Sequence, residues 1–176
     1  MKKIIALLLL AVMLFAFAAC ANTDETPDGM KDVAIENADY HLYVPEAWIE
    51  ANTLGISSAH AGAADVAFSP NVLVTVYYPD TATTIATYFA EIVKPQLALT
   101  YDDFALVEEG TATTLGGKDA AVYTYTYTLG GVSYKQKQVI VLNGYRFYSL
   151  FYTATADLYD TYVSEVDKIV AEFTFK

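Results

Sequence analysis

Side chains able to do nucleophilic, acid–base or metal chemistry are few and scattered in this sequence. Cys20 is the only cysteine, and His41 and His60, the only histidines, fit no HxH, HxxxH or HExxH spacing. His41 alternates with the apolar Leu42 in a strand-like segment, so we expect its side chain to face solvent. The histidines therefore predict no metal site, and no motif predicts a bound cofactor.

Two pairs of adjacent carboxylates are the remaining candidates for acid–base catalysis or calcium binding. Neighbouring residues of a strand point to opposite faces of a sheet, which separates Glu108 from Glu109. Asp102 and Asp103 are typical of a turn that follows a helix. The sequence contains neither a Gly-x-Ser-x-Gly motif nor the spacing of an EF-hand. We predict no catalytic residues and a protein that is not an enzyme.

The chemistry that the sequence does support lies at Cys20. Met1-Lys2-Lys3 is a short basic start, residues 4–19 are uncharged, and small residues precede the cysteine, as in a secretion signal. The uncharged run is shorter than the roughly 20 residues that a membrane-spanning helix needs. Phe17-Ala18-Ala19-Cys20 resembles the lipobox of bacterial lipoproteins, in which the thiol receives a diacylglyceryl group and the signal is cleaved before it. Phe17 stands where that family usually has Leu or another aliphatic residue.

This resemblance implies that residues 1–19 are a signal peptide and that Cys20 carries lipid, with fatty chains such as palmitate. Residues 20–32 begin polar and acidic and are interrupted by Pro27 and Gly29, which predicts a flexible tether. The expected location is extracytoplasmic, on the outer face of the bacterial cytoplasmic membrane. The alternative is an ordinary signal cut near Ala19 or Ala21, which leaves Cys20 as a free thiol.

Charge and length limit what the remaining chain can be. Residues 20–176 carry eight Lys and Arg against 21 Asp and Glu, a formal net charge of −13. Such a charge repels phosphate backbones, so we predict no nucleic-acid partner. The length is that of one domain with its own hydrophobic core, which we place at residues 33–176.

Hydrophobic patterning predicts strands over 40–44 and 71–78, and weak strands or a loop over 54–69. A first helix is predicted from Asp80 or Thr81, with Ile85, Tyr88, Phe89 and Ile92 on one face and an end or kink near Pro95. A last helix is predicted over about 156–173. Both helices are expected to cover a sheet.

Three strands between these helices are predicted to form a meander, turning at Gly130-Gly131 and Asn143-Gly144. Tight turns would pair Tyr127 with Tyr134, Tyr125 with Gln136, Tyr123 with Gln138, Ile140 with Phe147, Gln138 with Ser149 and Gln136 with Phe151. The face that holds the tyrosines of 123–127 is expected to pack under a helix. The opposite face, with its threonines and lysines, is expected to be at least half exposed to water.

Three segments resemble the PsbP-like and DcrB-like proteins. Tyr40-His41-Leu42-Tyr43-Val44-Pro45-Glu46-Ala47-Trp48 resembles their opening strand, and Phe104-Ala105-Leu106-Val107-Glu108 with Leu115-Gly116-Gly117-Lys118-Asp119-Ala120 is similar to their mid-chain pattern. The closing helix that runs into Phe173-Thr174-Phe175 fits as well. The resemblance covers most of 33–176 and implies an α+β fold, a central antiparallel β-sheet with two main helices packed against it. It brings no catalytic residue, metal or cofactor.

One polar group on the apolar face is a candidate ligand pocket. The predicted register places Gln136 and Gln138 beside Tyr123, Tyr125 and Ser149, and a buried amide must find hydrogen bonds. Either a small ligand binds there, or the tyrosine hydroxyls and the sheet margin satisfy the amides. The sequence thus favours a membrane-anchored, non-enzymatic binding or accessory domain. Its expected partners are the membrane and an envelope protein or small molecule. The alternatives are a ligand-capturing lipoprotein that serves a transporter and an envelope hydrolase.

Overall fold

The computed structural model describes residues 25–62 and 68–176. The predicted signal and Cys20 lie outside this part of the chain. Its strands are β1 (Met30–Asp32), β2 (Tyr40–His41), β3 (Tyr43–Pro45), β4 (Ile49–Glu50), β5 (Ser57–His60), β6 (Asn71–Tyr77), β7 (Asp102–Leu115), β8 (Lys118–Leu129), β9 (Val132–Asn143), β10 (Arg146–Thr155) and β11 (Thr174–Phe175). Its helical segments are α2 (Ile85–Tyr88), η1 (Phe89–Val93), α3 (Lys94–Thr100) and α4 (Tyr159–Glu172).

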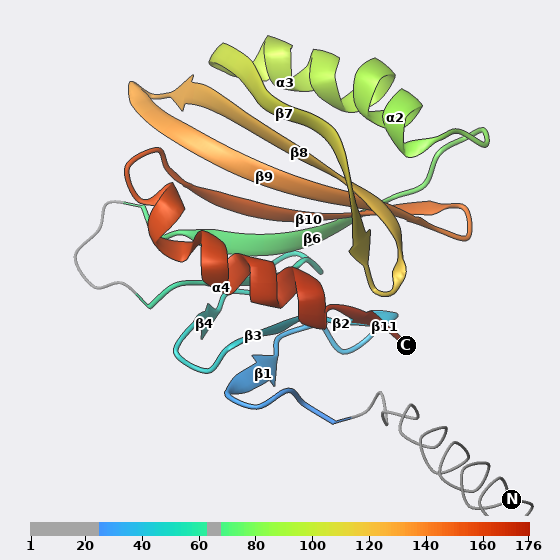
Figure 1. The fold of residues 1–176 in the computed structure, drawn as a ribbon, viewed down its shortest axis with the longest axis vertical. Coiled ribbons are helices and arrows are strands. Elements are labelled where there is room, and N and C mark those ends of the chain that lie inside the picture. Colours follow the sequence, from blue (N-terminus) through green and yellow to red (C-terminus); the bar gives the residue numbers. More distant parts are fainter. Residues whose placement is uncertain (1–24, 63–67) are drawn as a thin grey trace, which may run out of the picture.

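A seven-stranded antiparallel sheet lies between two helical layers (Figure 1). Its strand order is β4-β5-β6-β10-β9-β8-β7, and the short ladders β1–β3 and β2–β11 lie beside it. The segment α2-η1-α3 covers one face and α4 the other. Successive side chains of β9 point to opposite faces of the sheet and so contribute to both cores. Ile140 packs with the first helical segment, while Val139 and Val141 belong to the core beneath α4. The predicted α+β fold with two main helices is confirmed.

The tyrosine-rich face packs as predicted. Tyr123, Tyr125 and Tyr127 of β8 are buried beneath α2 and η1. The Phe89 ring stacks on Tyr123 with centroids 3.6 Å apart, and the Tyr88 ring stacks on Phe147 at 4.3 Å. Aromatic contact of this kind adds to simple apolar burial and fixes how the helix lies on the sheet.

The opposite face was predicted to be at least half exposed, and this prediction is wrong. The side chains of Val139, Val141, Tyr148, Leu150 and Tyr152 are fully buried there, in the larger of the two cores. The amphipathic helix α4 covers them, because burying its apolar stripe requires an apolar partner. The lysines on this face remain partly accessible at the margin of α4. They pair with carboxylates of that helix, Lys137 with Asp167 at 2.6 Å and Lys135 with Asp160 at 3.4 Å.

The first helix begins later than predicted, and of the two outcomes predicted at Pro95, an end or a kink, it does not end there. It begins at Ile85, not near Asp80, because the Thr84 hydroxyl accepts a hydrogen bond from the Thr87 backbone N–H and caps the first turn. It also continues past Pro95 to Thr100. The π-helical turn η1 ends at Val93, two residues before this proline, and a wider turn accommodates the missing N–H donor and the bulk of the ring.

The first hairpin of the meander has the predicted register, with Tyr127 opposite Tyr134, Tyr125 opposite Gln136 and Tyr123 opposite Gln138. The second hairpin is shifted by two residues. Arg146 pairs with Asn143, so the loop is Gly144-Tyr145, and its glycine has a φ of +66°. Glycine at the first loop position is typical of a type II′ turn, whereas the predicted Asn-Gly loop is typical of type I′. The pairs predicted for this hairpin are therefore wrong: Ile140 lies opposite Ser149, Gln138 opposite Phe151 and Gln136 opposite Thr153.

The amino-terminal part starts earlier than predicted. β1 pairs with β3, Met30 opposite Pro45, so paired structure begins inside the segment 20–32 that was predicted as tether. The predicted strand 40–44 is divided between β2 and β3, and the segment 54–69 contains the short strand β5. Trp48 follows β3 and is buried, and its indole Nε1 donates to Glu165 Oε2 of α4 at 2.7 Å.

Candidate functional site

Three of the five residues predicted to form a polar pocket meet in the interior. Gln138 Nε2 donates to Ser149 Oγ at 3.1 Å, and the Tyr125 hydroxyl donates to Gln138 Oε1 at 3.4 Å. Gln138 is 1% exposed, and burial raises the pKa of the Tyr125 hydroxyl, which keeps it a neutral donor. Tyr123 is buried beside Phe89, while Gln136 is half-buried.

This network satisfies the buried amide with hydrogen bonds from the protein itself. The Gln138–Ser149 contact is diagonal across the hairpin, so it survives the two-residue shift in register. A ligand would have to replace these bonds rather than fill open space. Ligand binding by Gln136, Gln138, Tyr123, Tyr125 and Ser149 therefore stays a prediction.

The other residues considered for chemistry are dispersed. His41 Nδ1 lies 2.7 Å from Asp32 Oδ2, and its ring stacks on Tyr43, so the side chain is tied to the surface rather than free in solvent. Glu108 accepts a hydrogen bond from the Thr124 hydroxyl, whereas Glu109 forms an ion pair with Lys94 of α3. The two glutamate side chains thus lie on opposite faces of the sheet. Within residues 25–62 and 68–176, no three His, Cys, Asp or Glu side chains are grouped to hold a metal ion.

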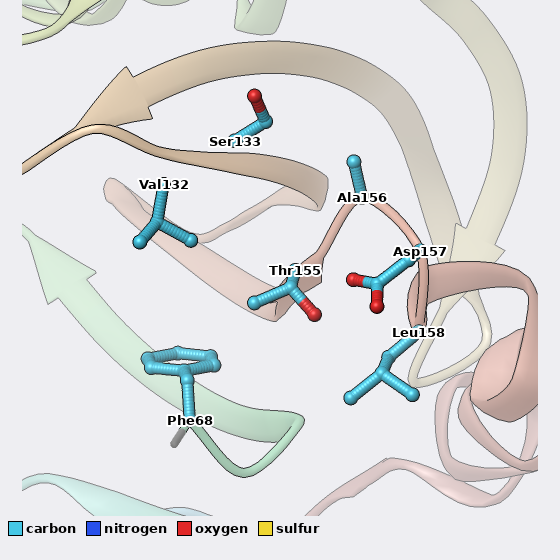
Figure 2. Close-up of a pocket in the computed structure, with 7 residues that line it drawn as sticks. All are labelled: Phe68, Val132, Ser133, Thr155, Ala156, Asp157 and Leu158. Atoms are coloured by element: carbon cyan, nitrogen blue, oxygen red, sulfur yellow. The ribbon is translucent and has the colours of Figure 1, made fainter. Parts of the chain in front are cut away.

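An apolar cup with a polar rim lies at the start of α4 (Figure 2). It has a volume of about 450 Å³, and the side chains of Phe68, Val132 and Leu158 border the same space. A hydrogen bond from the Thr155 hydroxyl, together with backbone N–H groups, holds the pKa of Asp157 below its usual value. The cup offers apolar contact and an ionised acceptor to whatever enters it.

A more polar pocket of about 420 Å³ lies at the end of β6. It is bordered by the connection between β1 and β2 and by Arg146, the first residue of β10. Arg146 Nη2 lies 2.7 Å from Asp39 Oδ2, and the Tyr148 hydroxyl donates to the same oxygen, also at 2.7 Å. The pKa of Arg146 is raised, first by its hydrogen bond with the Tyr78 side chain. We call this the Arg146 pocket.

The sequence carried one signal that pointed to the Arg146 pocket. Arg146 is the only arginine of the chain, and guanidinium groups are the usual partners of carboxylates. Its partner could not be read from the sequence, because Asp39 and Arg146 are 107 positions apart. In the described part of the chain, no helix is long and apolar enough to cross a membrane.

Comparison with known proteins shows the fold. No family model matches the sequence, and neither does any curated protein. Among solved structures, CyanoP, the PsbP of Synechocystis sp. PCC 6803, aligns with a TM-score of 0.60 at 14% identity, over 91% of this chain and 99% of CyanoP. LpqN of Mycobacterium tuberculosis, described as involved in cell envelope biogenesis, aligns with a TM-score of 0.57 at 17% identity, over 84% and 90% of the two chains.

A third similar structure comes from a eukaryote. The Ran-binding protein Mog1p of Saccharomyces cerevisiae aligns with a TM-score of 0.59 at 8% identity, over 83% of this chain and 95% of Mog1p. Similarity at such low identities extends to the fold and no further. The chain has a PsbP-like α+β fold.

Proposed function

We propose that this chain is a bacterial lipoprotein of the cell envelope whose PsbP-like domain works by binding a partner rather than by catalysis. The observation that carries the proposal is the order of features at the amino terminus. A basic start, an uncharged run over 4–19 and Cys20 precede a polar, acidic segment and then the folded domain. Lipid on Cys20 would hold the domain at the outer face of the cytoplasmic membrane.

Two of the similar structures support the functional half of this proposal. LpqN is described as a protein of envelope biogenesis, and Mog1p as a Ran-binding protein. Both descriptions fit a domain that works together with other molecules. Residues 20–176 carry a net charge of −13, so electrostatic attraction to anionic lipid would not hold this domain at a membrane. A covalent anchor would therefore be needed.

The anchor would also set how far the domain can move from the membrane. Ten peptide units separate Cys20 from Met30, the first residue of β1. An extended chain spans about 3.5 Å per residue, so β1 would lie within about 35 Å of the lipid attachment point. The partner of the domain is therefore expected among molecules at or near the membrane surface.

The test is the chemical state of Cys20 in the full chain, produced in a Gram-positive bacterium that lipidates exported proteins. We expect the intact mass of a chain beginning at Cys20 and carrying a diacylglyceryl group, and partition into the detergent phase of Triton X-114. Cys20→Ser should abolish both properties, while the neighbouring change Ala21→Ser should leave both intact. A wild-type protein cleaved near Ala19 or Ala21 without added lipid would overturn the proposal.

A further inference from the structure

The Arg146 pocket places one positive and one negative side chain side by side at a solvent-accessible position. The Arg146 side chain is 30% exposed and that of Asp39 is 39% exposed, so both groups can be reached from solution. Aromatic rings surround the guanidinium, whose carbon lies 5.4 Å from the Tyr148 ring centroid and 5.9 Å from that of Tyr78. These rings keep the guanidinium over the pocket.

Both charged groups keep bonding capacity. A guanidinium has five N–H donors, and a carboxylate can accept about four hydrogen bonds. The two contacts recorded for the Asp39 carboxylate, from Arg146 and from Tyr148, go to the same oxygen, Oδ2. A pair this exposed contributes little to stability, so a ligand that offers each group a new partner could replace the ion pair at small cost.

The rest of the pocket is mainly apolar. Ile35 and Ile56 line it from the connecting segments, and Val74 and Val76 line it from β6. Two of the hydroxyls at the pocket already have partners. That of Tyr40 shares a buried 2.8 Å hydrogen bond with Ser57, and the Tyr78 side chain is hydrogen-bonded to Arg146. An apolar wall beside a charge pair, in a volume of about 420 Å³, is the common design of a small-molecule site.

We propose that the Arg146 pocket binds an apolar α-amino acid as its zwitterion, with the ligand carboxylate on Arg146, the ammonium on Asp39 and the side chain against Ile35, Ile56 and Val76. Overall charge favours such a ligand. A free anion would be repelled by residues 20–176, whose net charge is −13, whereas a zwitterion carries no net charge. This site does not depend on lipid at Cys20, so failure of one proposal leaves the other standing.

The first test compares three probes of similar shape on the full wild-type chain in a non-ionic detergent, by isothermal titration calorimetry. They are L-leucine, 4-methylpentanoate, which lacks the ammonium, and 3-methylbutan-1-amine, which lacks the carboxylate. Removing one charge should weaken binding by about tenfold or more, since a charged hydrogen bond is lost each time. The proposal is overturned if L-leucine, L-valine and L-phenylalanine all fail to bind. It is equally overturned if the two single-charge analogues bind as well as L-leucine.

The second test uses variants, each first checked for folding by thermal denaturation. Arg146→Gln and Asp39→Asn should each reduce L-leucine binding by about tenfold or more. Lys137→Met is the matched control, because it removes an ion pair that lies elsewhere, between Lys137 and Asp167 at the margin of α4. It should leave binding unchanged. Retention of binding by both pocket variants, or equal loss in the control, would refute the assignment.

Discussion

Gly116 and Gly117 form the turn between β7 and β8, and they allow a direct test of how the sheet packs against the last strand. Both have positive φ, +59° and +71°. A Cβ added to Gly116 would lie 2.5 Å from Cδ2 of Phe175, closer than real Cβ atoms approach other atoms. A Cβ added to Gly117 would have no neighbour within 4 Å. The pair therefore separates backbone strain from steric conflict.

The magnitudes follow from these two terms. A left-handed backbone costs an alanine roughly 1–2 kcal/mol relative to glycine, so Gly117→Ala should lose about that amount of unfolding free energy. Gly116→Ala should lose roughly 1–3 kcal/mol more, the usual cost of overpacking. The neighbouring ring cannot move away easily, because β11 pairs with β2 and Phe173 is buried in the core. For a chain of this size, each 1 kcal/mol lowers Tm by about 2–4 °C.

Urea unfolding followed by circular dichroism measures both variants under the same conditions. We expect Gly116→Ala to be clearly less stable than Gly117→Ala, with the same dependence on urea concentration. Adding Phe175→Ala should recover part of the extra loss in Gly116→Ala and none of the loss in Gly117→Ala. Equal stability of the two single variants would refute the packing described for β11 against this turn.

Two further predictions concern single polar groups. In the described ranges, Thr174 Oγ1 is the one buried side-chain oxygen or nitrogen without a hydrogen-bond partner. Thr174→Val should therefore leave the free energy of unfolding unchanged or raise it by about 1 kcal/mol in the same urea assay. A loss of more than about 1 kcal/mol would contradict this. Burial raises the pKa of Tyr88 to about 12, and that of Tyr159 to about 12 as well, from 10.0. Because the folded state holds these protons more tightly than the unfolded chain, the stability they contribute is present below pH 10 and lost between about pH 10 and 12. The tyrosinate absorbance of these buried rings should therefore appear only with the loss of circular dichroism, and complete titration near pH 10 of a chain that stays folded would disprove the reasoning.

The faces of the meander could be predicted from the sequence, even where the register could not. Side chains alternate with a period of two, so a shift of two residues at the second turn changes the partners of Gln138 and Ile140 without changing which face they occupy. A type I′ loop at Asn143-Gly144 and a type II′ loop at Gly144-Tyr145 both suit the twist of an antiparallel hairpin, so the sequence pattern does not choose between them.

Features that depend on distant segments were missed for a different reason. The water-exposed face was predicted from the threonines and lysines of β8 and β9, but α4 lies over it and supplies carboxylates to Lys135 and Lys137. The pairing of Arg146 with Asp39 likewise arises only when the connection between β1 and β2 crosses the end of β6. Local propensity contains no information on such contacts.

The strand order has a consequence for how the chain acquires this structure. Strands β7 to β10 are successive neighbours, so each can pair with the preceding one soon after it is made. β6 instead joins β10 from 70 positions earlier in the chain, with Tyr77 opposite Phe147. Closing so long a loop is the larger entropic cost, which delays contacts of high sequence separation. We therefore expect a folding order in which the meander forms first and β6 arrives late, although its place in the finished sheet is central.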